Sequence, residues 1–143
     1  MKYFKHTCKS TLEQRLARKF QQLSNGQACA VCGQIAHCEH HIIRRHQSEL
    51  LRYDWRNGLH LCRECHNRIH NGEIPEPVAP KHKELLQFIA TINFKDILRE
   101  RGITAEEYYR EKERELDEQL SDLDIQYVRI SNGYVYQGPD IPF

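Results

Sequence analysis

The chain has 143 residues, of which 39% are hydrophobic and 29% are charged, and its formal net charge is +1. That length allows one domain with a modest core, or a small metal-stapled domain with a helical extension. No apolar run approaches the length that crosses a bilayer, and the first residues lack the long apolar segment of a signal peptide. We therefore expect a cytoplasmic protein without a membrane partner.

A helix is predicted near the start of the chain. Ser10–Glu13 has the pattern of a capping box, and Ser24–Gly26 is a stop signal. Between them, apolar residues recur at helical spacing: Leu12, Leu16, Phe20 and Leu23. We expect this helix to pack on the rest of the domain. Arg15, Arg18 and Lys19 fall on or near its open face, where they are solvated or touch nucleic acid.

A small α+β core is predicted next. Residues 27–33 indicate a tight turn that presents two thiolates, and short strands are expected over 41–43 and 57–61. A short helix follows over 63–71 and is closed by Gly72. Together these segments predict an antiparallel strand pair followed by a helix.

Residues 71–80 are a proline-rich link. No helix crosses it, because a proline lacks the amide hydrogen and clashes with the preceding turn. We therefore place a domain boundary inside it, with a metal-bearing domain over 1–75 and a helical extension over 76–143. In that extension, apolar residues predict helical structure up to Gly102, broken near Asn93.

The last third of the chain predicts a charged helix and then a hairpin. Thr104–Glu107 is a second capping box, and the helix that it opens carries a narrow apolar stripe: Tyr109, Leu116, Leu120 and Leu123. The stripe either docks on the preceding helix or pairs two subunits as a homodimer. Residues 126–137 predict a β-hairpin around Asn132-Gly133, a dipeptide that tolerates the positive φ angles of a tight turn.

Six cysteines in an intracellular chain favour zinc over disulfides. Four of them form two C-x-x-C pairs, Cys29 with Cys32 and Cys62 with Cys65, which can complete a closed tetrahedral zinc shell. Such a site is structural and has no open position for chemistry. Cys38 is interpreted as a small buried residue rather than as a further ligand.

Three histidines predict a second, open metal site. His66 and His70 are four residues apart, so on a helix their rings reach the same point. With His40 from the preceding strand, three neutral imidazoles can hold one divalent ion and leave room for water and a phosphate oxygen. Glu39 is expected to be a solvated carboxylate.

Alternation along a strand sends the side chains of His40 and His41 to opposite sides, which leaves His41 free of the metal. A free imidazole with an ordinary pKa near 6.5 can take a proton from water at neutral pH. His41 is therefore the candidate general base for hydrolysis of a phosphodiester.

Positive charge is concentrated in the half of the chain that carries these motifs. Residues 1–70 hold 12 Lys and Arg against 5 Asp and Glu, whereas residues 71–143 hold 9 against 15. A basic surface suits a polyanion such as DNA, although solubility alone can also produce this asymmetry. Arg44 and Arg45 directly follow the first strand and are the candidates for gripping the DNA backbone.

The stretch from Cys29 to His70 resembles an HNH endonuclease of the ββα-metal class with a four-cysteine zinc site. The resemblance makes His41 the general base and Asn57 the residue that holds the catalytic loop. It makes His40 and His66 metal ligands, and the His66-x-x-x-His70 ending is similar to the nuclease domain of bacterial DNase colicins. It implies cleavage of DNA that leaves 5′-phosphate and 3′-hydroxyl ends, with Mg²⁺, Mn²⁺, Ni²⁺ or Zn²⁺ as the catalytic ion.

A weaker resemblance extends beyond the core. The run Leu51–Asn57 and the Thr104–Leu123 helix are laid out like the NinG/Rap recombination endonucleases of lambda-like phages. This implies a bacterial or phage-infected cell and branched or recombining DNA as the substrate. Two alternatives stay open: a zinc-stabilised nucleic-acid-binding module without catalysis, and a nuclease subunit of a phage DNA-packaging machine.

Overall fold

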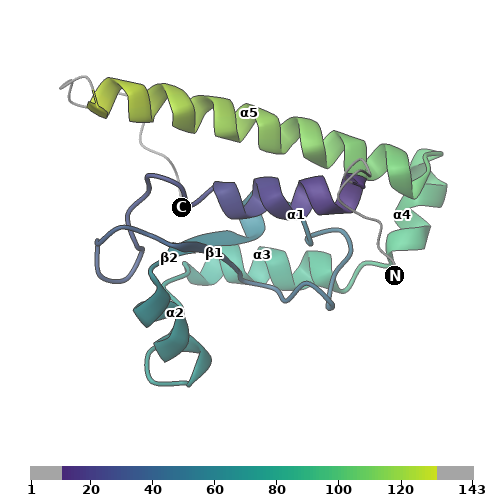
Figure 1. Cartoon of the computed structure of the whole chain (residues 1–143). Coiled ribbons are helices and arrows are strands. Elements are labelled where there is room, and N and C mark those ends of the chain that lie inside the picture. Colours follow the sequence, from purple (N-terminus) through teal and green to yellow (C-terminus); the bar gives the residue numbers. More distant parts are fainter. Residues whose placement is uncertain (1–10, 132–143) are drawn as a thin grey trace, which may run out of the picture.

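The computed structural model describes residues 11–131, with side chains up to Asp122. Figure 1 shows the elements in chain order: α1 (Leu12–Gln22), β1 (Cys38–His41), the 3₁₀ turn η2 (Trp55–Asn57), β2 (Gly58–Leu61), α2 (Arg63–His70), α3 (Pro80–Ala90), α4 (Phe94–Arg101) and α5 (Ala105–Ser131). Among the helices of that stretch, none is at once long and apolar enough to pass through a membrane.

Over residues 11–131, helices and one small sheet make an α+β protein, as the sequence predicts. The sheet is the antiparallel pair of β1 and β2. In Figure 1, α5 lies over α1, α1 lies over the sheet, and α3 lies on the opposite side of the sheet. The short helix α2 projects from the end of β2, so strand, strand and helix follow one another as expected.

The first strand lies earlier in the chain than predicted. The expected strand over 41–43 was wrong in its bounds, because the ladder ends at His41. Ile42 and Ile43 leave it to bond with Asn57 instead. The Ile42 amide donates to the Asn57 backbone carbonyl at 2.9 Å, and the Ile43 amide donates to Asn57 Oδ1 at 2.7 Å. A buried side chain thus ends the strand.

The N-terminal helix α1 begins at a capping box one residue later than predicted. Thr11, not Ser10, is the cap: its hydroxyl accepts from the Gln14 amide, and the Gln14 side chain accepts from the Thr11 amide. Ser10 lies outside the described residues. The buried face of α1 includes Leu16 and Phe20, both fully covered.

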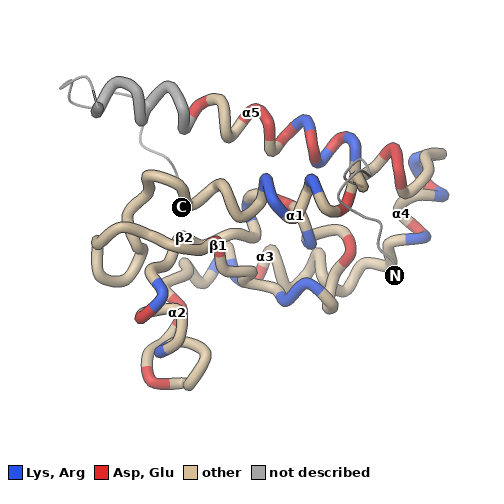
Figure 2. Tube along the Cα trace, viewed as in Figure 1, with Lys and Arg blue, Asp and Glu red and all other residues tan. Residues whose placement is uncertain are grey.

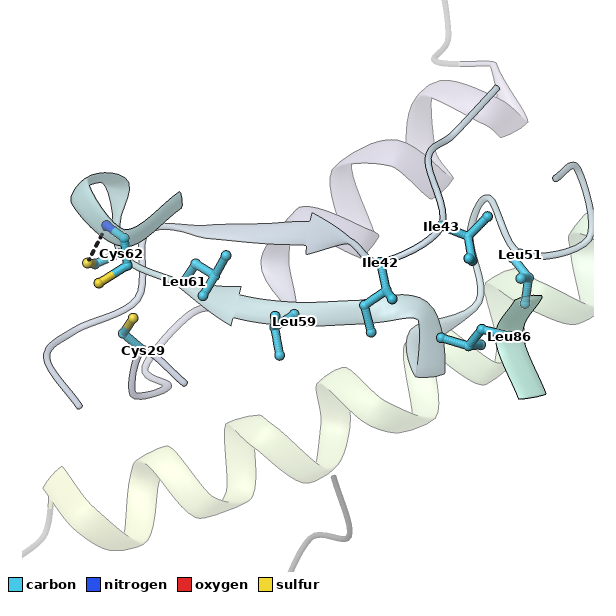
Figure 3. Packing of buried hydrophobic residues seen from close by; sticks show 9 residues of the cluster. Cys29, Ile42, Ile43, Leu51, Leu59, Leu61, Cys62 and Leu86 are labelled. Carbon is cyan, nitrogen blue, oxygen red and sulfur yellow. Dashed lines mark hydrogen bonds between the residues drawn. The ribbon is translucent and has the colours of Figure 1, made fainter. Parts of the chain in front are cut away.

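Among the described side chains, the core consists of two hydrophobic clusters. The first lies along the strand pair and includes Cys29, Ile42, Ile43, Leu51, Leu59, Leu61, Cys62, Cys65 and Leu86. Figure 3 shows the thiols of Cys29 and Cys62 at one end of the sheet and Leu86 of α3 at the other. The second cluster joins α1 to α5 through Leu16, Phe20, Leu23, Leu50, Tyr53, Tyr108, Tyr109 and Leu116. Both clusters contain residues from either side of the predicted boundary at residue 75, which stays a prediction.

The apolar stripe of the last helix is used inside the chain. Tyr109 and Leu116 are buried against α1, and Leu120 packs beside them. Dimerisation through this helix stays a prediction. Because α5 continues to Ser131, the predicted first strand of the hairpin, residues 126–131, is wrong; a formed helix propagates at low cost when no glycine or proline interrupts it. The predicted turn and second strand lie outside the described residues.

Cations of α1 pair with α5 rather than facing solvent. Arg15 Nε lies 2.9 Å from Glu113 Oε2, and Lys19 Nζ lies 3.0 Å from the same oxygen and 2.8 Å from Asp117 Oδ1. Figure 2 shows basic positions of α1 beside acidic positions of α5. The prediction that Arg15 and Lys19 lie on an open face is therefore wrong, whereas Arg18 is exposed.

A buried ion pair fastens α5 to the turn before β2. Lys112 Nζ lies 2.9 Å from Asp54 Oδ2, with side-chain exposures of 9% and 2%. Arg56 also bonds to Asp54. Burial alone would raise the pKa of Asp54, but the Arg56 hydrogen bond and the Lys112 charge together lower it to about 2. Tyr108 adds a hydrogen bond from its hydroxyl to the Leu50 carbonyl at 2.8 Å.

Replacement of Lys112 by methionine should lower the free energy of unfolding by about 3 kcal/mol, because it leaves Asp54 buried with one cation fewer. Urea denaturation at pH 7 measures this change. Arg114→Met is the matched control, since Arg114 is exposed on the same helix and its loss should alter the free energy by at most about 0.5 kcal/mol. Equal unfolding midpoints for the two variants would contradict the bracing role of this pair.

Candidate metal centres

Four thiols meet at the end of the strand pair next to α2. The ligand atoms of Cys29, Cys32, Cys62 and Cys65 all lie within 4.8 Å of one another. Cys32 Sγ and Cys62 Sγ are 3.7 Å apart. A zinc–sulfur bond of about 2.3 Å in a tetrahedron places two sulfurs about 3.8 Å apart, so the cluster is compatible with a structural zinc ion.

Local backbone geometry presents these thiols. The first pair lies in a turn closed by a hydrogen bond from the Gly33 amide to the Cys29 carbonyl, and Gly33 has a φ of 78°, which a residue with a Cβ rarely adopts. Cys62 caps α2 and accepts from the Cys65 amide at 3.4 Å. Cys38 lies outside the group, with its thiol directed at the Leu61 carbonyl.

Three imidazoles form a second group beside α2. His66 and His70 come from consecutive turns of that helix, and His40 comes from β1. The three ring centroids are 5.2 Å (His40–His66), 6.2 Å (His40–His70) and 4.9 Å (His66–His70) apart, and the ligand atoms all lie within 4.8 Å of one another. Such a nitrogen set suits a divalent transition metal and leaves coordination positions for water or substrate.

His41 is separate from that group. Its ring stacks on Phe20 of α1 with centroids 4.2 Å apart, and its Nε2 lies 2.9 Å from the Arg52 carbonyl oxygen. A carbonyl only accepts, so Nε2 carries the hydrogen and Nδ1 keeps a free lone pair. Burial lowers the pKa of His41 to about 4. The ring is therefore neutral at pH 7, although a low pKa makes it a weaker proton acceptor than an exposed imidazole.

Asn57 holds the loop that follows β1. It is fully buried, and its side-chain amide donates to the Ile43 carbonyl at 2.9 Å and to the Leu51 carbonyl at 3.1 Å, while its oxygen accepts from the Ile43 amide. Three bonds from one side chain thus fix both ends of the segment between residues 43 and 51. Arg52, whose carbonyl binds His41, comes directly after that segment.

A hollow of about 1060 Å³ opens beside the histidines. Its lining contains all three rings of the group, His41 and the exposed Arg44 and Arg45. Imidazole and guanidinium groups therefore share one surface.

Two carboxylates near the histidines are not where the sequence predicts: one was expected to be solvated, and the other was not considered. Glu39, expected to be solvated, is 3% exposed and its Oε1 lies 2.6 Å from His60 Nδ1, across the strand pair. Glu76 was not predicted at all, yet its Oε2 lies 2.6 Å from His40 Nε2. The only signal for Glu76 was an acidic residue between two prolines, which carries no spacing rule.

Comparison of the chain with family models, curated proteins and solved structures finds no match. The class of site is therefore defined by the geometry of its own residues.

Proposed function

We propose that the protein is a metal-dependent DNA endonuclease of the HNH type that hydrolyses phosphodiester bonds. One observation carries the proposal: three imidazoles converge on one point while the adjacent ring, His41, is held apart from them by the Arg52 carbonyl. Three ligands with a separate neutral base are what metal-assisted hydrolysis requires. The cluster of four cysteines nearby suits a structural zinc ion. Because sulfur would fill all four coordination positions, that ion could not bind water or substrate.

In this proposal each residue has a defined task. His40, His66 and His70 hold Mg²⁺, Mn²⁺, Ni²⁺ or Zn²⁺, which when bound supplies positive charge to the phosphate and the departing oxygen. Nδ1 of His41 takes a proton from the attacking water, because Nε2 is already committed to the Arg52 carbonyl. Asn57 keeps the intervening loop in place, and branched DNA stays a prediction for the substrate.

A plasmid assay tests the proposal. Protein that holds one zinc ion per chain, for the four-cysteine site, is incubated with supercoiled DNA, with and without added Mg²⁺, Mn²⁺, Ni²⁺ or further Zn²⁺, and the products are separated on a gel. We expect nicked or linear DNA only with added ion. Binding of DNA without cleavage in the presence of any of these ions would instead support the alternative of a zinc-stabilised binding module.

Replacement of Arg44 and Arg45 by alanine should weaken DNA binding, because both exposed guanidinium groups lie at the hollow. Each lost phosphate contact should reduce the slope of log K against log salt by about 1. Fluorescence anisotropy of labelled duplex DNA, titrated at several salt concentrations in a His41→Ala background, measures both effects. Arg114→Ala, on the distant helix α5, should change neither; an unchanged slope in the Arg44→Ala and Arg45→Ala double variant would remove these residues from the DNA surface.

A further inference from the structure

Glu76 reaches the histidine group from outside the strand–strand–helix core. It follows α2 in the link between Pro75 and Pro77, and its side chain is 21% exposed. One carboxylate oxygen, Oε2, lies 2.6 Å from His40 Nε2, and the other, Oε1, lies 2.5 Å from Lys83 Nζ on α3. Both oxygens of this carboxylate are thus engaged at the edge of the hollow.

The link is held so that Glu76 keeps this position. Pro75 and Pro77 fix the backbone φ on either side of it, and the Val78 amide donates to the Glu76 carbonyl at 2.9 Å. Val78 itself packs against the first hydrophobic cluster. Lys83 is anchored in the first turns of α3, a helix that inserts Leu86 into the same cluster. The carboxylate is therefore placed by packed residues on both sides.

The contact with Glu76 defines which nitrogen of His40 is free. A carboxylate only accepts hydrogen bonds, so His40 Nε2 must carry the hydrogen. A ring nitrogen that carries a hydrogen has no lone pair for a metal, which leaves Nδ1. Glu76 itself is not in the set of described side chains whose ligand atoms all lie within 4.8 Å of one another, so its place is behind His40 rather than among the ligands.

We propose that Glu76 is a positioning residue, which binds Nε2–H of His40 so that Nδ1 faces the metal, and that Lys83 holds the Glu76 carboxylate in turn. A carboxylate behind a metal-binding histidine fixes the ring orientation and makes the ligand nitrogen more basic. This inference deepens the proposed function, since it uses the same three-histidine site. It adds to that site two residues from the link and from α3.

Metal binding measured without DNA tests this role. Ni²⁺ is titrated calorimetrically into protein that holds one zinc ion per chain, for the four-cysteine site, and Glu76→Gln, which keeps the side-chain size but not the charge, should raise the dissociation constant by about 10- to 100-fold. Lys83→Met should weaken binding in the same direction and by less. Glu73→Gln is the matched control, because Glu73 is exposed in the same link and contacts no histidine of the group. Equal Ni²⁺ affinities for the Glu76 and Glu73 variants would overturn the proposal.

Nitrogen NMR of the imidazoles gives a second test. It reports which nitrogen of His40 binds the metal, which a purely structural role of Glu76 would not determine. In the wild type with Zn²⁺ in both sites, His40 should show a protonated Nε2 and a metal-bound Nδ1. A metal-bound Nε2 would overturn the assignment. If wild-type protein binds metal in the expected way but cuts no DNA, the nuclease proposal fails while the role of Glu76 stands.

Discussion

Replacement of His41 by alanine should reduce the rate of plasmid cleavage by about 10²- to 10⁴-fold, the usual contribution of a general base. His41 is the histidine of the hollow whose ring is held outside the metal-binding group by the Arg52 carbonyl. Metal affinity should therefore stay close to the wild-type value while cleavage is lost. Nicking rates and Ni²⁺ titration, measured on the same preparation, separate the two effects.

Two further variants control for a folding defect, because the alanine substitution also removes the stacking of His41 on Phe20. His41→Gln can still donate to the Arg52 carbonyl but cannot accept the proton from water, so it should be as inactive as alanine. His37→Ala alters an exposed histidine and should cut at the wild-type rate. Cleavage by both His41 variants within a few-fold of the wild-type rate would remove His41 as the base.

We expect the four-cysteine cluster to hold a structural zinc ion, and removal of that ion should unfold the sheet and α2. Binding of zinc to a four-ligand site is worth about 10–16 kcal/mol, which is as large as the whole stability of a small domain. Cys29, Cys62 and Cys65 belong to the hydrophobic cluster along the strands, so loss of the ion disrupts the core as well as the turn. We expect a strong chelator to abolish the cooperative thermal transition followed by circular dichroism, and added Zn²⁺ to restore it.

A pair of serine variants makes the same prediction specific to the sulfur site. Cys62→Ser should bind less zinc and unfold at a lower temperature, whereas Cys38→Ser, which alters a thiol outside the group, should have little effect on either. A metal-free protein that melts at the temperature of the zinc-loaded form would exclude a structural role for the ion.

Part of each ligand set could be predicted because its spacing is local. Each C-x-x-C pair, and the His-x-x-x-His on a helix, brings its own side chains together. The meeting of the two cysteine pairs, and of His40 with α2, depends on the fold. Strand alternation was enough to separate His40 from His41, and the structure separates them as predicted.

Features that depend on contacts between distant segments could not be read from the sequence. The end of β1 is set by the buried side chain of Asn57, and Glu39 is buried because His60 lies opposite it in the sheet. Glu76 joins the site only because the link folds back onto β1. The Gln126–Ser131 segment has strand-like composition, yet it continues a helix that is already formed.

The proposed nuclease activity requires three histidines to share one ion while a fourth stays unligated. Anomalous diffraction at the nickel edge tests this most directly, with crystals of protein that holds one zinc ion per chain soaked in Ni²⁺, because zinc at the sulfur site gives little signal at that wavelength. We expect a nickel peak within bonding distance of His40, His66 and His70, with His41 still bound to the Arg52 carbonyl. Nickel bound by His41, or nickel elsewhere with the three rings free, would contradict the proposed site.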